Sequence, residues 1–88
     1  MLKLVIGTKT VTISANGYSS IRIPMTVENG YTVSFAIGYA LNNLNVSVYN
    51  FYYDTDSKEV VIGAKNTSSS SITIDAIARC IAERDMFY

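Results

Sequence analysis

The sequence predicts a small all-β protein, an antiparallel β-sandwich of jelly-roll-like form with seven or eight strands. Three observations support this fold class. Apolar and polar residues alternate through most of the 88 residues, which is the period of a strand with one buried face. Turn-forming pairs such as Asn16-Gly17 and Asn29-Gly30 recur along the chain. The segments between the turns are spaced about 8–12 residues apart, as in sandwiches and barrels.

Length and composition limit the other options. A chain of 88 residues has room for one domain, so we assign residues 1–88 to a single β-sandwich domain. Its seven basic and seven acidic residues balance, which argues against a nucleic-acid partner because phosphate binding depends on clustered Lys and Arg. A content of 49% hydrophobic residues argues against disorder. No apolar run approaches the roughly 20 residues that span a bilayer, so we expect no membrane insertion.

The first quarter of the chain predicts three extended segments. Residues 1–7 form a short apolar segment that is typical of a first strand. Residues 9–15 alternate strictly and end at Asn16-Gly17, a pair that suits a tight turn. In the next segment, residues 18–27, Pro24 cannot donate a ladder hydrogen bond. This segment should therefore be an edge strand or contain a bulge.

The middle of the chain predicts further strands. Residues 28–30, Glu-Asn-Gly, are the clearest hairpin signal in the sequence. Residues 31–39 have the most regular apolar alternation, so we expect them at the centre of a sheet, with Gly38 marking a bend or a close backbone approach. The strand that begins at Leu44 has an unclear parity after Asn50 because residues 51–53 are all aromatic. A bulge near Asn50 would re-aim their side chains.

The last third of the chain begins with a turn at residues 54–57, followed by a short strand over residues 58–64 and a polar loop over residues 66–71. The loop leads into a closing element, residues 72–82. Its approach is rich in Ser, Thr and β-branched Ile, which favours a strand. A helix is the alternative, because some of the Ile and Ala residues also share a helical stripe. As a strand, the element directs one face to the core, made of Ile72, Ile74, Ala76, Ala78, Cys80 and Ala82.

The sequence Lys65-Asn66-Thr67, the serine run and the alternating Ile/Thr strand resemble the C-terminal β-sandwich domains of bacteriophage and prophage fibre, baseplate and capsid-appendage proteins. The resemblance covers most of the chain and is strongest over residues 66–74. It implies a non-enzymatic structural module of a phage-like particle, located in the virion after synthesis in the bacterial cytoplasm. It also implies a homotrimer with other virion structural proteins as partners. Such domains usually follow a long fibrous or anchoring segment, whereas this sequence begins almost at its first strand. We therefore expect a free-standing small subunit or an excised tip.

The residue types present argue against catalysis. The sequence contains no histidine, which excludes Ser-His and Cys-His nucleophiles and most zinc sites, so we expect no enzymatic activity. The acidic residues around Asp54 and Asp56 have the spacing of part of a calcium loop, but the glycine of such loops is missing and Lys58 occupies a ligand position. We interpret this segment as a hairpin turn and expect no metal or cofactor. Cys80, the single cysteine, is expected to be a small apolar group in the core.

The apolar residues near the C-terminus exceed what so small a core needs. A terminal strand with Ile on both faces can bury its second face only against another subunit. The sequence therefore predicts an oligomer interface made of Ile77, Ile81, Met86, Phe87 and Tyr88.

An alternative function comes from the tyrosines. The sequence has seven tyrosines and no tryptophan, and several aromatic residues are crowded between residues 49 and 53. Flat rings with polar tips build sugar-binding platforms as well as protein interfaces. This alternative is a receptor-binding tip for host-surface carbohydrate, with the candidate residues Tyr49, Tyr53, Asn45 and Asn50.

Overall fold

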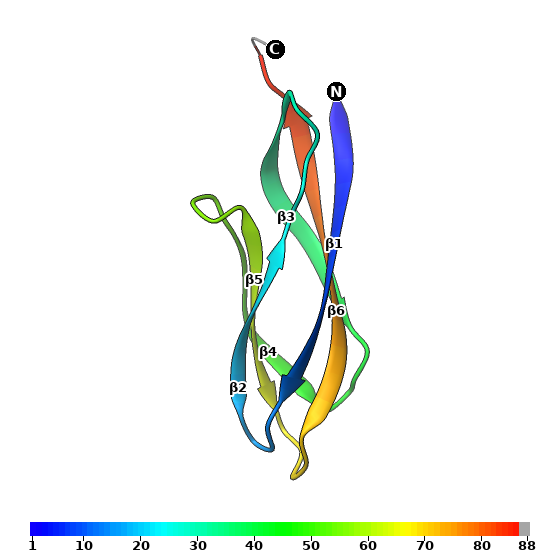
Figure 1. Ribbon diagram of the computed structural model, residues 1–88, viewed down its shortest axis with the longest axis vertical. Helices are drawn as coiled ribbons and strands as arrows, with labels where there is room; N and C mark the ends of the chain where they lie inside the picture. The colour runs from blue at the N-terminus through cyan, green and yellow to red at the C-terminus, as the bar shows by residue number, and fades with distance from the viewer. Residues whose placement is uncertain (87–88) are drawn as a thin grey trace.

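The structure, a computed structural model, describes residues 1–86, which form two three-stranded antiparallel sheets and no helix (Figure 1). Sheet A has the strand order β1-β6-β3 and sheet B has the order β2-β5-β4. The molecule is elongated, with principal extents of 51 × 20 × 16 Å. The six strands are β1 (Leu2–Ile13), β2 (Tyr18–Pro24), β3 (Tyr31–Leu41), β4 (Val46–Asp54), β5 (Glu59–Asn66) and β6 (Ile72–Arg84).

The all-β class is confirmed, but the described residues form six strands rather than seven or eight. The difference arises at Gly7, where the first two expected strands are one continuous strand, β1, paired with β6 from Leu2 to Ile13. Gly7 does not interrupt the ladder. It allows a close approach, because a Cβ atom there would lie 2.7 Å from Met25 Sδ and 2.9 Å from the Pro24 carbonyl oxygen.

Four of the five connections carry the chain from one sheet to the other, and β4 and β5 alone form a hairpin. The hairpin predicted at residues 28–30 is therefore wrong. The turn itself forms, with Gly30 at φ 89° and the Tyr31 N–H bonded to the Glu28 carbonyl, but it redirects the chain from sheet B to sheet A. The strand that follows, β3, lies at an edge of sheet A and not at its centre. The edge position predicted for the segment containing Pro24 is confirmed.

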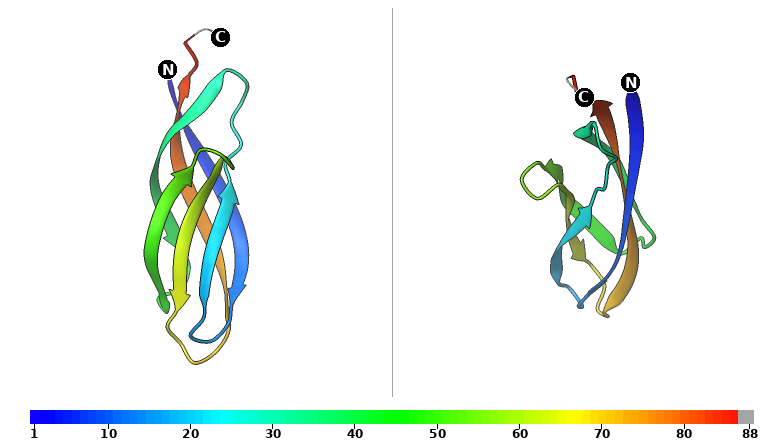
Figure 2. Two further views of the ribbon diagram at one scale, coloured as in Figure 1. Left: turned by 90° about the vertical axis from the view of Figure 1, so that its left-hand side faces the viewer. Right: turned by 45° about the horizontal axis from the view of Figure 1, so that its top comes forward.

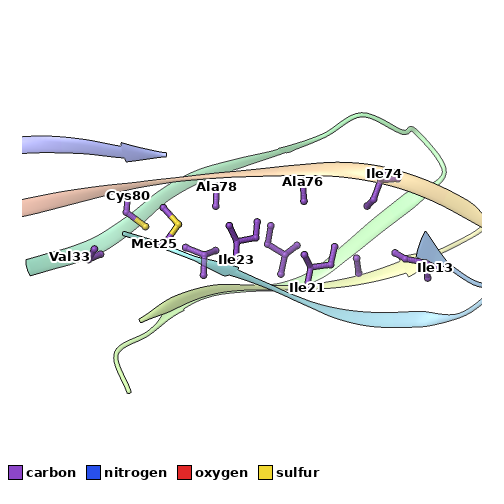
Figure 3. Close-up of a cluster of buried hydrophobic side chains, with 12 residues drawn as sticks. Ile13, Ile21, Ile23, Met25, Val33, Ile74, Ala76, Ala78 and Cys80 are labelled. Atoms are coloured by element: carbon purple, nitrogen blue, oxygen red, sulfur yellow. The ribbon is translucent and has the colours of Figure 1, made fainter. Parts of the chain in front are cut away.

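The strand predicted over residues 72–82 is also confirmed, and it is the central strand of sheet A. Its inner face is lined by small residues, among them Ala76 and Ala78, which are fully buried. Larger side chains from sheet B, including Ile21 and Ile23, project toward them (Figure 3). Small residues on one layer facing large residues on the other allow close packing. Cys80 is buried in the same cluster, as predicted.

The two sheets differ in length. The strands of sheet A have 11 to 13 residues and those of sheet B have 7 to 9. Figure 2 shows that sheet B covers one side of sheet A, while β1, β3 and β6 extend beyond it at the end that carries the N-terminus. At that end the segment leaving β2 contributes Met25 to the core, where it packs in the same cluster as Val33 and Cys80.

Asn66 was expected in an exposed polar loop, but it is fully buried at the end of β5. Its Nδ2 donates to the carbonyl oxygens of Ile13, Ser14 and Ser70 at 3.1, 3.2 and 2.7 Å. Its Oδ1 accepts hydrogen bonds from the backbone N–H and the hydroxyl of Ser68. This single side chain therefore joins the end of β1, the end of β5 and the serine loop.

Candidate interaction surfaces

The outer face of sheet A carries cross-strand rows of apolar residues. In an antiparallel ladder, residues directly opposite each other project from the same face. Leu4 of β1 and Phe35 of β3 both lie opposite Ile81 of the central strand. One step along the sheet, Ile6 lies opposite Arg79. Ile77 comes next and is flanked by a threonine on β1 and an alanine on β3.

These outward side chains remain accessible. Leu4, Ile6 and Phe35 are 56%, 55% and 51% exposed, and Ile77 and Ile81 are half-buried between them. Arg79 projects between the two isoleucines, and the apolar side chains lie on either side of it. Exposed apolar surface commonly marks an interaction site. The two isoleucines of the central strand were predicted from the sequence. Their neighbours on β1 were not, although the strict alternation at residues 2, 4 and 6 already indicated them. We call the following residues the outer apolar face: Leu2, Leu4, Ile6, Phe35, Ile77 and Ile81.

Of the other predicted interface residues, Met86 does not join this surface. Met86 is exposed beyond the end of β6 and has no position in the cross-strand rows. The residue before it, Asp85, is held by a hydrogen bond from its N–H to the Gly30 carbonyl. Phe87 and Tyr88 lie outside the described residues.

The outer face of sheet B is lined by tyrosines and polar residues. Tyr18 and Tyr49 are 67% and 57% exposed, and their rings meet edge to face with centroids 5.8 Å apart. The Tyr49 ring lies over Gly63 of the central strand, where a Cβ atom would be 2.6 Å from the ring. Lys65 places its ammonium group 5.2 Å from the centroid of the Tyr18 ring.

Tyr49 and Tyr53 were predicted to share a binding face, and the structure places them on opposite faces. The register shift between Val48 and Asn50 adds one residue to β4 and reverses the parity beyond it. The predicted bulge near Asn50 is confirmed, but its consequence is that Tyr53 lies opposite Val60 and packs against the core. Burial raises the pKa of Tyr53.

The two predicted asparagines also separate. Asn50 is exposed on the outer face of sheet B, opposite Gly63. Asn45 lies in the loop before β4, where its N–H bonds to the side chain of Asn43. The aromatic residues on the same face as Asn50 are instead Tyr18, Tyr49 and Tyr52, and of these only Tyr49 was predicted for the site.

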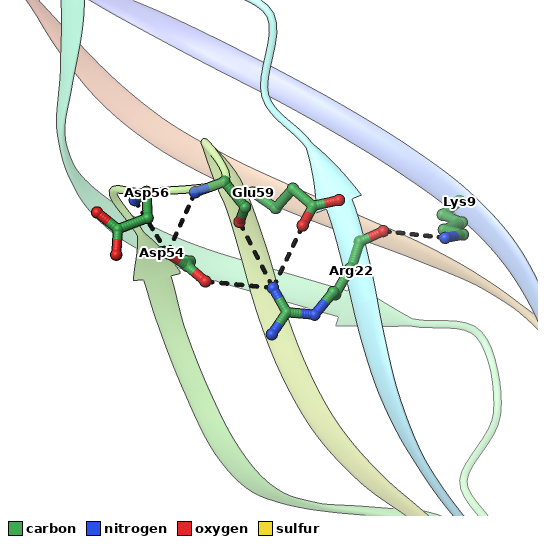
Figure 4. Close-up of polar contacts among 6 residues, drawn as sticks. Lys9, Arg22, Asp54, Asp56 and Glu59 are labelled. Atoms are coloured by element: carbon green, nitrogen blue, oxygen red, sulfur yellow. Dashed lines mark hydrogen bonds and ion pairs between the residues drawn. The ribbon is translucent and has the colours of Figure 1, made fainter.

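At the other end of sheet B, Arg22 neutralises the acidic turn (Figure 4). Its Nη1 lies 3.2 Å from Asp54 Oδ2 and 3.3 Å from Glu59 Oε1. Asp54 Oδ1 also accepts the backbone N–H groups of Asp56 and Ser57. The backbone bond from Ser57 and the contact with Arg22 lower the pKa of Asp54. The turn is the predicted hairpin.

Residues 1–86 offer neither a cluster of metal ligands nor a membrane-spanning helix. These residues contain no cluster of three or more acidic, Cys or His side chains placed to hold a metal ion. They also include no helix with the length and apolarity to cross a membrane. Comparison of the chain with protein-family models, with curated proteins and with solved structures found no match.

Proposed function

We propose that this protein is a non-enzymatic structural module that self-associates through the outer apolar face of a sandwich-type fold. The observation that supports the proposal is the alignment of Leu4, Ile81 and Phe35 across all three strands of sheet A, with half or more of each flanking side chain exposed. These side chains have no polar atoms that could form hydrogen bonds with water. A second apolar surface is the partner that their chemistry favours.

Burial of the apolar side chains on this surface favours association. Complete burial of one large aliphatic or aromatic side chain contributes about 1.5–3 kcal/mol. The outer apolar face has six such residues, and their combined burial can offset the loss of translational and rotational freedom on binding. A small domain also gains stability when its assembly covers surface that folding alone leaves open.

The setting that we propose is a phage-like particle, in which the module belongs to a fibre, baseplate or capsid appendage. This part of the proposal rests on the resemblance of residues 66–74 to domains of such proteins. It includes a homotrimer as the assembled form, other virion structural proteins as partners and the virion as the location.

Replacing Ile81 with Asp tests the proposal, because the substitution puts a charge at the centre of the outer apolar face without entering the core. We expect Ile81→Asp to convert the assembly to monomers, as measured by light scattering across a gel-filtration peak. Thr73→Asp is the matched control, because Thr73 is also an outward residue of β6 but lies opposite Thr12, away from the apolar rows. Circular dichroism should be that of the wild type for both variants. An assembly that survives Ile81→Asp would contradict the proposal.

We propose carbohydrate binding on the outer face of sheet B as the second candidate function. Tyr18, Tyr49 and Asn50 supply accessible rings beside an amide, which suits a host-surface glycan. Saturable binding in a glycan array should be lost in Tyr49→Ala. It should be kept in Tyr49→Phe, which preserves the ring and removes the hydroxyl. Absence of saturable binding by the wild-type protein would remove this candidate.

A further inference from the structure

The upper half of β1, residues 2–8, is an open sheet edge, and residues 9–13 form its lower half. The Arg84 N–H donates to the Met1 carbonyl, so Met1 and Arg84 form a hydrogen-bonded pair across the β1–β6 ladder. On the other side of β6, the Asp85 N–H donates to the Gly30 carbonyl, which fits the alternation of a central strand. Odd-numbered residues of β1 therefore bond to β6. The backbone groups of Leu2, Leu4 and Ile6 point away from it.

Nothing in the described part of the chain pairs with these backbone groups. The backbone hydrogen bonds outside the strand ladders include none from residues 2–8. Natural proteins usually protect an edge with charged residues, proline or a covering segment. Residues 2–8 contain one charged residue, Lys3, whose side chain projects from the inner side of the sheet and pairs with Glu28 at 2.6 Å.

The lower half of β1 is different. The Lys9 ammonium group donates to the Arg22 carbonyl of β2 at 3.1 Å, which ties this half to sheet B. Its outward residues are threonines. Thr10 donates to Asp75 at 2.7 Å, and the hydroxyls of Thr12 and Thr73 lie 2.9 Å apart. One strand thus has a polar half with its contacts made within the chain and an apolar half with an unpaired edge.

A groove lies beside the open half. It has a volume of about 220 Å³ and is lined by residues 3–6 of β1, residues 26–28 of the segment after β2, Tyr31 and Ala82. A strand added to the edge of a sheet needs room for the side chains that it directs inward. The groove offers that room next to Val5, at the middle of the open half.

We infer that the open edge of β1 pairs with β1 of a second copy of this chain, antiparallel and about a two-fold axis. Leu4 then lies opposite Ile6 of the partner subunit, and the two copies of sheet A form one continuous six-stranded sheet. This inference rests on the proposed self-association and adds an edge contact to it, since the pairing itself leaves the outer apolar face open for a further contact. The outer apolar faces of the two subunits become one surface.

Charge and length select this register. Pairing Leu4 with Ile6 of the partner subunit places Lys3 opposite Gly7 of the partner subunit, so no like charges meet. Registers that place Lys3 opposite Lys3 or Lys9 of the partner subunit are disfavoured by repulsion. The register with Leu4 opposite itself avoids repulsion but pairs a shorter stretch of β1. The chosen register uses every open backbone group from residue 2 to residue 8.

Two double variants test the pairing. Leu4→Lys with Ile6→Glu places opposite charges across the two-fold contact, whereas Leu4→Glu with Ile6→Glu places like charges there. We expect the second variant to raise the dissociation constant at least tenfold over the first, by roughly 1.4 kcal/mol or more. Both variants put two charges on the outer apolar face. Equal weakening of association in the two would mean that the edges do not pair.

Cross-linking tests the register without charges. In a Cys80→Ala background, a mixture of Leu4→Cys and Ile6→Cys chains should form a disulfide-linked heterodimer under oxidation, because paired residues of adjacent strands lie within disulfide reach. Neither variant alone should cross-link efficiently. Equal cross-linking in the separate variants and in the mixture would overturn the register.

The solution mass separates the inference from the proposed function. Edge pairing requires an even number of chains. A dimer would support the pairing and overturn the trimer, whereas a hexamer would support both. A strict trimer would overturn the pairing and leave the proposed function standing, and a monomer at all concentrations would overturn both.

Discussion

The two sheets differ in how far their outer faces are covered by side chains of the same chain. In sheet B the central strand directs Val61 outward, and this residue is only 3% exposed because Arg22 and Tyr52 flank it on the neighbouring strands. In sheet A the central strand directs Ile77, Arg79 and Ile81 outward. The residues that flank the two isoleucines on the neighbouring strands are themselves apolar or short. Sheet B therefore covers its outer face within the chain, and sheet A does not.

The difference shows how side-chain type decides whether the apolar surface of a sheet face is covered within the chain. Arg and Tyr have apolar stems or rings that cover a neighbour and polar ends that stay in water. Leu, Ile and Phe have no such ends, so a face built from them stays in contact with water until another apolar surface covers it. The same reasoning distinguishes a face that can bind a hydrated ligand from one that favours another protein surface.

The largest effect on stability is expected at Asn66, because its side chain joins a strand of sheet A to a strand of sheet B. Asn66→Ala leaves the carbonyl groups of Ile13, Ser14 and Ser70 without their shared donor. We expect the free energy of unfolding to fall by about 2–4 kcal/mol, measured by urea denaturation. Asn45→Ala is the control, because Asn45 bonds through its backbone. A loss no larger than that of the control would show that Asn66 does not join the sheets.

A matched pair of aromatic truncations compares the faces directly. Phe35→Ala removes a ring from the outer apolar face, and Tyr52→Ala removes one from the covered face of sheet B. We expect Phe35→Ala to weaken self-association by about tenfold to a hundredfold, since one large apolar side chain contributes about 1.5–3 kcal/mol when buried. Sedimentation equilibrium measures the effect. If Tyr52→Ala weakened association as much, the two faces would not differ in the way described.

Two glycines provide a smaller comparison between an inner and an outer face. Gly7→Ala forces a methyl group toward the Pro24 carbonyl, which cannot move freely, and should destabilise the fold by about 1–3 kcal/mol. Gly63→Ala presses on the outer end of the Tyr49 ring, which can rotate away, and should cost less than about 1 kcal/mol. Urea unfolding measures both changes, and near-ultraviolet circular dichroism should report the moved ring. The reverse order of stability would contradict this account of the packing.

The smallest effect is expected at the edge of sheet B. The backbone bond from Ser57 and the contact with Arg22 hold the pKa of Asp54 below its ordinary value. The folded state therefore gains stability from Asp54 above the ordinary carboxyl pKa and loses it as the pH falls through the lower, folded value. We expect Asp54→Asn to lower the melting temperature at pH 7, and the difference from the wild type to shrink as the pH falls. A difference that persists at low pH would indicate another cause.

Local preferences predicted the individual strands well. The Ser, Thr and β-branched residues at the start of residues 72–82 predicted the strand β6, and the alternation of the segment predicted both of its faces. The crowded aromatic residues indicated the bulge in β4. These properties depend on neighbouring residues in the sequence. They can be read without knowledge of the fold.

The pairing of strands could not be predicted in the same way. A turn such as residues 28–30 has the same local chemistry whether the next strand returns to its own sheet or crosses to the other. Each register shift also reverses the parity beyond it, which is why Tyr53 was assigned to the wrong face. The alignment of Leu4 and Phe35 with Ile81 depends on contacts between distant segments, so it could be seen only in the structure.

The most direct test of self-association through sheet A is the mass of the wild-type protein in solution, measured by light scattering at several concentrations. We expect a stable mass at least twice that of the 9.7 kDa chain. A mass of 9.7 kDa at every concentration would contradict it, because the outer apolar face would then remain in contact with water.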